Sequence, residues 1–271
     1  MTRCWMSAVL LAGCLIGAAS VHAGTITVTD LPDATGQVCF GNCQAEGEDL
    51  FRFSLGIDPQ TGDIVPIGNG RFESVDGDVV ILGTAGNVDP ALGLALSIVD
   101  FGAPTAFAIS LTAPLIPTYS AGTLLASMAT LSGTLIDAAI DGDGLVAMSA
   151  LSASGMLMQS LVNGTPVSSI GAPVPSTSVG SGGSLAYGPF SATDTLVCPV
   201  GGCDMFGLTL SFTGNGGGDR YELNGRFDLS EMQSVPVPGV LLLMALGLAV
   251  MPTRRWRDQG QSRLSSTPAV P

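Results

Sequence analysis

The sequence lacks lysine altogether and is poor in histidine and tryptophan. Its 271 residues carry nine basic side chains, all arginine, together with one histidine and two tryptophans. His22, Trp5 and Trp256 lie in the terminal regions, so residues 24–234 contain none of these three residue types. A Ser-His-Asp relay, a lysine Schiff base and a histidine-ligated metal are therefore excluded for this segment. We predict a protein that is not an enzyme, and a secreted glycan hydrolase that uses a carboxylate pair is the catalytic alternative.

Charged residues are also scarce, at 11% of the chain, and acids dominate among them. The whole chain has a formal net charge of −13. Residues 24–235 hold 21 acids against four arginines, a formal charge of −17. Such a surface repels nucleic-acid phosphates, so no nucleic-acid partner is expected. With 37 glycines and 17 prolines, the composition is typical of an exported all-β protein.

Residues 1–23 have the anatomy of a secretory signal peptide. A short cationic start leads into an apolar stretch and then into a small-x-small cleavage pattern. The sequence predicts that signal peptidase cuts between Ala23 and Gly24. The alternative is a lipoprotein, because Leu11-Ala12-Gly13-Cys14 also fits a lipoprotein cleavage box.

Export would place the remaining cysteines in an oxidising compartment, where two disulfides are expected. Two local bridges are predicted because each would close a tight turn that contains glycine. A zinc site with four cysteine ligands is the functional alternative. The residues concerned are Cys39 and Cys43, in VCFGNC, and Cys198 and Cys203, in VCPVGGC.

Between residues 24 and 234 the hydrophobic pattern has a period of two almost throughout, which indicates strands. Clear examples are LFRFSLGI at residues 50–57 and FGLTLSFT at residues 206–213. Turn signals such as Asp76-Gly77-Asp78 and Asn215-Gly216 separate the runs. Many short strands with such turns predict one antiparallel, jelly-roll-like β-sandwich over residues 24–234.

Three local features of this body were less regular in the sequence. The stretch from Leu124 to Leu161 could form helix, but its threonines, its glycines and the neighbouring strands favour β structure. Residues 171–183 predict a low-complexity loop. Gly225 interrupts an alternating run and suggests a bulge.

The C-terminal segment combines prolines, a short apolar run and arginines. Thirteen apolar or small residues run from Gly239 to Met251. They would supply about 20 Å of helix, whereas a bilayer core is about 30 Å thick. The sequence predicts a short transmembrane helix with its arginines on the cytoplasmic side. Residues 258–271 are expected to be a disordered tail.

This arrangement resembles the PEP-CTERM sorting signal of exosortase substrates. Val235-Pro236-Val237-Pro238 matches a Val-Pro-Val-Pro form of the motif, residues 240–251 match the helix, and Arg254, Arg255 and Arg257 match the arginine cluster. The resemblance implies a Gram-negative bacterium in which an exosortase-type membrane protease cuts near the prolines. The body would be periplasmic while the inner membrane holds the tail, and would then reach the cell surface or the extracellular space, where family members associate with extracellular polysaccharide and biofilm. The alternative for residues 235–257 is an ordinary single-pass anchor.

Acidic turns are the candidate metal sites. Asp137, Asp141 and Asp143 place three carboxylates within seven residues, and Glu73 with Asp76 and Asp78 forms a second trio. Calcium prefers such oxygen ligands, although neither stretch follows the EF-hand pattern. Hairpin turns without an ion are the structural reading, and no cofactor is otherwise expected.

Together these features predict an exported, non-catalytic surface or matrix protein with a structural or adhesive role. A calcium-dependent carbohydrate-binding module is the binding alternative. Residues 24–234 have few aromatic side chains that could stack on sugars. Besides phenylalanine, they contain only Tyr119, Tyr187 and Tyr221.

Overall fold

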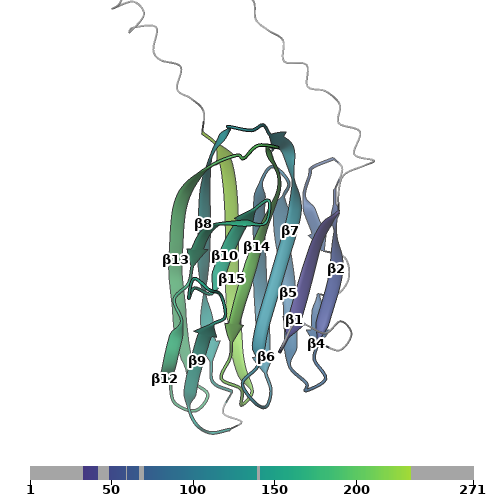
Figure 1. The fold of residues 1–271 in the computed structure, drawn as a ribbon. Coiled ribbons are helices and arrows are strands. Elements are labelled where there is room, and N and C mark those ends of the chain that lie inside the picture. Colours follow the sequence, from purple (N-terminus) through teal and green to yellow (C-terminus); the bar gives the residue numbers. More distant parts are fainter. Residues whose placement is uncertain (1–32, 42–48, 59, 67–69, 139–140, 233–271) are drawn as a thin grey trace, which may run out of the picture.

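The computed structural model describes residues 33–41, 49–58, 60–66, 70–138 and 141–232, and its elements are all β-strands (Figure 1). The strands form two sheets, and every strand pair is antiparallel. The predicted all-β class and the β-sandwich are thus confirmed for these residues. The predicted signal helix and C-terminal helix lie outside the described residues.

The first sheet has nine strands, seven of them in one continuous path. Along that path the order is β11 (Thr165–Ile170), β10 (Met158–Val162), β14 (Cys203–Thr213), β7 (Ala106–Tyr119), β1 (Ala34–Phe40), β2 (Leu50–Ile57) and β3 (Ile64–Pro66). Strand β9 (Leu145–Ala150) pairs with the end of β14 and with β12 (Val174–Ser178).

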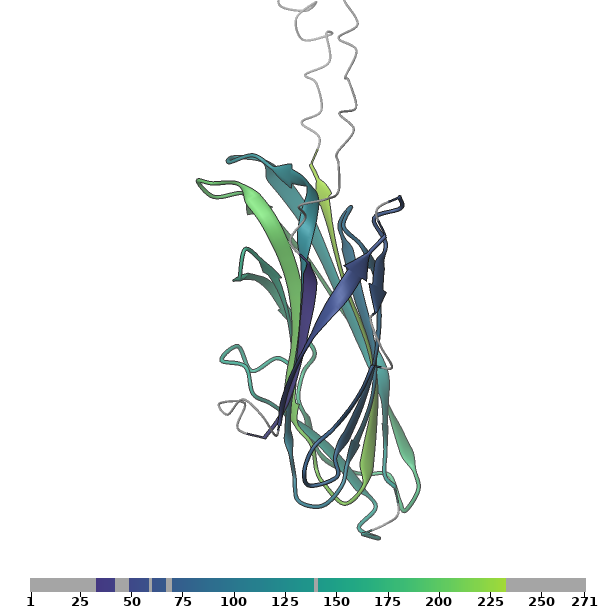
Figure 2. The same cartoon turned by 90° about the vertical axis from the view of Figure 1, so that its right-hand side faces the viewer.

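The second sheet has six strands, and its order places β15 between β8 and β6. That order is β13 (Ser184–Val197), β8 (Leu124–Ile136), β15 (Asp219–Glu231), β6 (Ala91–Asp100), β5 (Val79–Asn87) and β4 (Arg71–Glu73). The chain crosses repeatedly between the sheets, as from β6 to β7 and from β13 to β14. The strands run along the length of an elongated body, and the quarter-turn view shows the two layers (Figure 2).

The core lies between the sheets and is filled by the residues that alternate inward. In β6, Leu92, Leu94, Leu96 and Ile98 are all buried, and the residues between them are more exposed. Aromatic rings link the layers, since Phe212 of β14 lies 5.1 Å from Tyr221 of β15, measured between ring centroids. A continuous apolar core of this kind is what the period-two pattern predicts.

The stretch from Leu124 to Leu161 forms strands, as predicted. It contains β8, β9 and most of β10. The alternation in β8 places Leu125, Ala129 and Leu131 in the core. Tertiary burial of one face, rather than local propensity, decides the conformation here.

Two sequence-based predictions are wrong. Residues 171–183 are not wholly a loop, because β12 occupies Val174–Ser178 and pairs with β9. Gly225 is not a bulge, because it pairs in regular register with Leu94 and with Leu131. A Cβ at Gly225 would come within 2.8 Å of the Met158 sulfur, so this glycine allows the second sheet to approach β10 closely.

Candidate functional site

Four buried aspartates lie side by side at one end of the six-stranded sheet. Asp219, the first residue of β15, is the direct partner of Asp100, the last residue of β6. Val79 pairs with Val99, which places Asp78 beside Asp100. Arg220 pairs with Ile136, which places Asp137 beside Asp219. We call Asp78, Asp100, Asp219 and Asp137 the aspartate row, and the end of the sandwich that holds it the aspartate end, at the bottom of Figure 1.

Each member of the row points to the interior because it is in phase with the buried residues of its strand. Asp100 follows Ile98 by two positions, and Asp219 precedes Tyr221 by two. The relative exposures of Asp78, Asp100, Asp137 and Asp219 are 2%, 0%, 1% and 0%. Within the described ranges, these four are the buried charged side chains. Such a group is costly, because carboxylates lose hydration on burial and repel one another across neighbouring strands.

Backbone amides satisfy part of the row. The N–H of Phe101 donates to Asp78 Oδ1 at 2.7 Å. The N–H groups of Gly216 and Thr105 donate to Asp100 Oδ2 at 2.8 and 3.4 Å. Asp78 and Asp100 therefore fix the loops that join the two sheets at this end.

Asp219 differs from its neighbours in the row. Both of its carboxylate oxygens are buried, and neither accepts a hydrogen bond of regular geometry from a described residue, although the Ala138 N–H lies near enough to lower the pKa of the group. The adjacent Arg220 does not neutralise it, because its guanidinium pairs with Glu222 at 2.8 Å on the outer face, where about half of the Arg220 side chain is exposed. Asp219 is thus a carboxylate enclosed by protein without a visible counter-charge.

Burial raises the pKa of two members of the row. The pKa of Asp219 rises to about 7, first through burial and then through the charges of Asp137, Asp141 and Asp143, and the Ala138 amide opposes the rise. The pKa of Asp100 rises to about 6, again through burial, with a smaller contribution from the charge of Asp78 and with the Gly216 and Thr105 amides opposing it. Both shifts express the cost of keeping buried groups ionised beside other carboxylates.

The predicted trio Asp137, Asp141 and Asp143 is brought together. One carboxylate oxygen from each lies within 4.8 Å of the other two. We call these three residues the acidic cluster. Asp137 is buried and accepts a hydrogen bond from the Gly182 N–H at 2.7 Å, whereas Asp141 and Asp143 are exposed. The cluster therefore joins the interior of the aspartate end to its surface.

The other predicted trio is not brought together. Glu73 is exposed and pairs with Arg71 at 3.0 Å, and Asp76 is exposed in the turn before β5. Asp78 is buried in the aspartate row instead. These residues do not form a site, and the prediction that they could is wrong because alternation turns Asp78 inward, away from Glu73.

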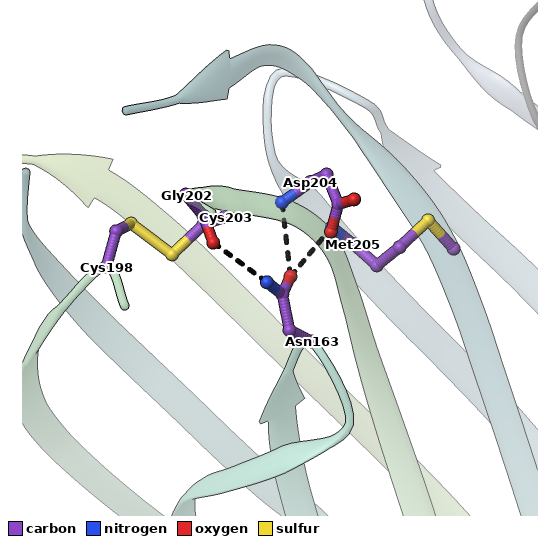
Figure 3. Close-up of a disulfide and its surroundings, with 6 residues drawn as sticks. All are labelled: Asn163, Cys198, Gly202, Cys203, Asp204 and Met205. Carbon is purple, nitrogen blue, oxygen red and sulfur yellow. Dashed lines mark hydrogen bonds between the residues drawn. A yellow bond between two sulfur atoms is a disulfide. The ribbon is translucent and has the colours of Figure 1, made fainter. Parts of the chain in front are cut away.

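The opposite end of the sandwich is held by a disulfide. Cys198 and Cys203 are bonded, with their Cα atoms 5.4 Å apart, at the corner where the chain passes from β13 to β14 (Figure 3). This confirms one of the two predicted bridges and removes these sulfurs from any zinc site. Cys39 is also disulfide-bonded, and Cys43 lies outside the described residues. We call this the disulfide end.

The Asn163 carboxamide fastens the same loop. Its Nδ2 donates to the Gly202 carbonyl at 2.9 Å, and its Oδ1 accepts from the N–H groups of Asp204 and Met205, each at 3.1 Å (Figure 3). Asn163 adopts a φ of 49°, a left-handed conformation that asparagine tolerates better than most residues. Asn163-Gly164-Thr165 fits the sequence pattern for N-glycosylation, and the Asn163 side chain is engaged in these three hydrogen bonds.

Two shallow surface depressions are formed by described residues. One lies across β13, β8 and β15 and includes Asp194 and Asp228, and the other lies across β2, β1 and β7 and includes Arg52. Asp228 is held by Arg226, whose Nε and a terminal nitrogen approach its oxygens at 2.7 and 2.6 Å. Neither lining set contains tyrosine.

Comparisons with known proteins add little. No family model matches the chain, and no curated protein matches it. Among solved structures, the structure of infectious bursal disease virus, Gx strain, aligns with 77% of this chain at 12% identity, with a TM-score of 0.18. The chain spans about half of that viral chain, 53% of its length.

Several predicted sites fall where the structure gives no description. They are Ala23 and Gly24 of the signal cleavage site, and Val235, Pro236, Val237, Pro238, Arg254, Arg255 and Arg257 of the sorting tail. Within the described ranges, no helix is long and apolar enough to cross a membrane.

Sequence reasoning missed Asp78, Asp100 and Asp219 as one group. They are far apart in the chain, and only the sheet order brings them together. A usable signal exists, because each aspartate lies two positions before or after a buried strand residue, where an apolar side chain would normally continue the pattern.

Proposed function

We propose that this chain is an exported, non-catalytic protein of the cell surface or extracellular matrix, with a structural or adhesive role. Its C-terminal segment would direct exosortase-type processing after transient anchoring in the inner membrane, and its body would take a jelly-roll-like form. The observation that carries this proposal is the Cys198–Cys203 disulfide within an acidic β-sandwich. Disulfides persist in oxidising compartments, which supports export.

The buried carboxylates support a structural role over a catalytic one. A catalytic acid must reach its substrate, but Asp100 and Asp219 are 0% exposed. The long strands and the continuous core instead suit a protein that bears load or spaces other components. Extracellular polysaccharide is the partner that the tail resemblance favours.

The test of sorting is the intact mass of the protein from the medium and the membranes of its native host. We expect a species that runs from Gly24 to about Val235, lighter by the hydrogens of two disulfides. A host strain without its exosortase is the matched control and should retain a membrane-bound precursor. Recovery of only a membrane-bound form that keeps Arg254 to Pro271, in both strains, would contradict processing.

The test of a non-catalytic role is a glycan panel applied to the protein recovered from the medium. We expect polysaccharide from the host matrix to retain the protein without release of reducing ends. Hydrolysis that disappears in an Asp194→Asn variant would establish the hydrolase alternative.

A further inference from the structure

We propose that Asp219 and the acidic cluster (Asp137, Asp141 and Asp143) together bind one calcium ion. The acidic cluster alone would not justify this, because Asp-Gly turns commonly expose carboxylates without an ion. Asp219 supplies the independent observation. It is fully buried, neither oxygen accepts a hydrogen bond of regular geometry from a described residue, and strand register places it beside Asp137 of the cluster.

Strand register places Asp219 beside Asp137. Because Arg220 of β15 pairs with Ile136 of β8, the next position along the ladder sets Asp219 opposite Asp137. Both side chains are in phase with buried residues, so both point into the sandwich. Directly opposed side chains have Cβ atoms about 5 Å apart, and two like charges there destabilise a sheet.

The loop before β15 closes the site from the other side. Asp141 Oδ2 lies so close to Gly217 that a Cβ added there would be 1.9 Å from it. The electrostatic effect of all three cluster residues on Asp219 agrees with this placement. The carboxylates from β15, from the end of β8 and from the loop before β9 therefore converge on one region.

The ligand set matches calcium. Calcium takes six to eight oxygens at about 2.4 Å, so two ligands of one ion lie up to about 5 Å apart. The separations within the acidic cluster, at most 4.8 Å, satisfy this limit. The three cluster carboxylates and water can supply the ligands, Asp219 adds its buried charge beside Asp137, and flexible geometry suits calcium better than magnesium. Zinc would favour histidine or cysteine ligands, and neither residue type occurs in the site.

The ion pairs recorded for the described part of the chain do not involve the residues of this site. The ion pairs recorded among described residues are Arg71–Glu73, Arg220–Glu222 and Arg226–Asp228, and all lie on the surface. A divalent ion would offset the repulsion within the aspartate row and would tie β8 to β15. This inference does not depend on the sorting tail, since it uses only described residues of the body.

The experiment is calorimetric titration of the protein purified from its host, in the processed form that the host makes, after dialysis against a chelator. Calcium chloride should bind with a stoichiometry of one and with a dissociation constant of roughly 10⁻⁴ to 10⁻³ M, as in extracellular modules. At a calcium concentration 100-fold above that constant, Tm should rise by roughly 5–10 °C.

Two variants, Asp219→Asn and Asp141→Asn, test the site, and a third, Asp76→Asn, is the matched control. Asp219→Asn keeps the shape of the side chain and removes its buried charge, so it should fold and should bind calcium at least tenfold more weakly. Asp141→Asn, at an exposed position, should weaken binding similarly without threatening the fold. Asp76→Asn removes an exposed turn aspartate outside the site and should leave calcium binding unchanged.

Three results would overturn the proposal. The first is the absence of both heat and a Tm rise when calcium is added to the unsubstituted protein. The second is a calcium affinity in Asp219→Asn equal to that of the control. The third is an equal affinity for magnesium, which would contradict the assignment to calcium.

Discussion

At the disulfide end, the chain turns from β13 into β14 through a loop held by a covalent bond and by the Asn163 carboxamide. At the aspartate end, β5 and β15 begin, and β6 and β8 end, among four buried carboxylates. The loop at the disulfide end is held by bonds within the chain. At the aspartate end, Asp219 has no counter-charge among the described residues. The same two sheets thus rely on bonds within one corner loop at the disulfide end and, by our proposal, on an external ion at the aspartate end, where β1 also carries the disulfide-bonded Cys39.

The largest expected effect on the unfolding free energy comes from replacing a buried phenylalanine by alanine at either end of the sandwich. Phe212→Ala removes a fully buried ring that packs on Phe107 and Tyr221, and should cost about 4 kcal/mol of unfolding free energy. It should also weaken calcium binding, because the Tyr221 hydroxyl accepts the Asn215 N–H and so positions the loop before β15. Denaturant unfolding and calcium titration measure the two effects.

Phe206→Ala is the matched control for that variant. Phe206 is equally buried but lies near the start of β14, with its ring 6.3 Å from that of Phe227. It should lose a similar unfolding free energy and keep its calcium affinity. Equal weakening of calcium binding in both variants would show that the two ends are not independent.

Removing the disulfide should have the next largest effect. The double variant Cys198→Ala/Cys203→Ala frees a loop of few residues, and the chain-entropy model gives a loss of about 2 kcal/mol. The loss should be the same with calcium and with chelator, as measured by denaturant unfolding in each buffer. A loss that depends on calcium would contradict the separation of the two ends.

A smaller effect is expected from Asn163→Gly. Glycine accepts the φ of 49° without strain, so the variant removes the three hydrogen bonds of the carboxamide without distorting the backbone, and adds a smaller cost from the greater freedom of the unfolded chain. The expected loss is roughly 1–2 kcal/mol. In the background without the Cys198–Cys203 bond the loss should shrink, because both features hold one loop. If the losses in unfolding free energy from Asn163→Gly and from removal of the disulfide simply add in the combined variant, the two features do not hold one loop together.

The smallest effect is expected at a site that belongs to neither end. Arg226→Gln breaks an exposed ion pair with Asp228 in the middle of the sheet. The change in unfolding free energy should be roughly 0–1 kcal/mol and should vanish in high salt. A larger loss would mean that surface pairs, and not only the two ends, determine stability.

Alternation predicted most of this fold from the sequence. Leu92 to Ile98 and Phe206 to Phe212 are buried in the pattern that period two requires. The strand at Val174–Ser178 was missed because its serines, threonine and proline resemble a loop, and it is held as a strand by pairing with β9 rather than by burial. Its pattern is mostly exposed, so hydrophobicity gives no signal there.

The candidate site was predicted only in part. Asp137, Asp141 and Asp143 are neighbours in the chain, so their spacing revealed them. Asp219 is 76 residues beyond Asp143, and its place depends on β15 inserting between β8 and β6. Such an insertion is a property of the sheet order, which a single sequence does not encode locally.

The position of β15 also determines how the body responds to tension. Both of its sides are paired along most of its length, with β8 and with β6, and its 13 residues extend about 40 Å. A tether attached to the chain beyond Glu231 would pull along the axis of β15. The ladder bonds are perpendicular to it and would be sheared together rather than broken one after another. The strand that such a tether would load is therefore held by neighbouring strands on both sides.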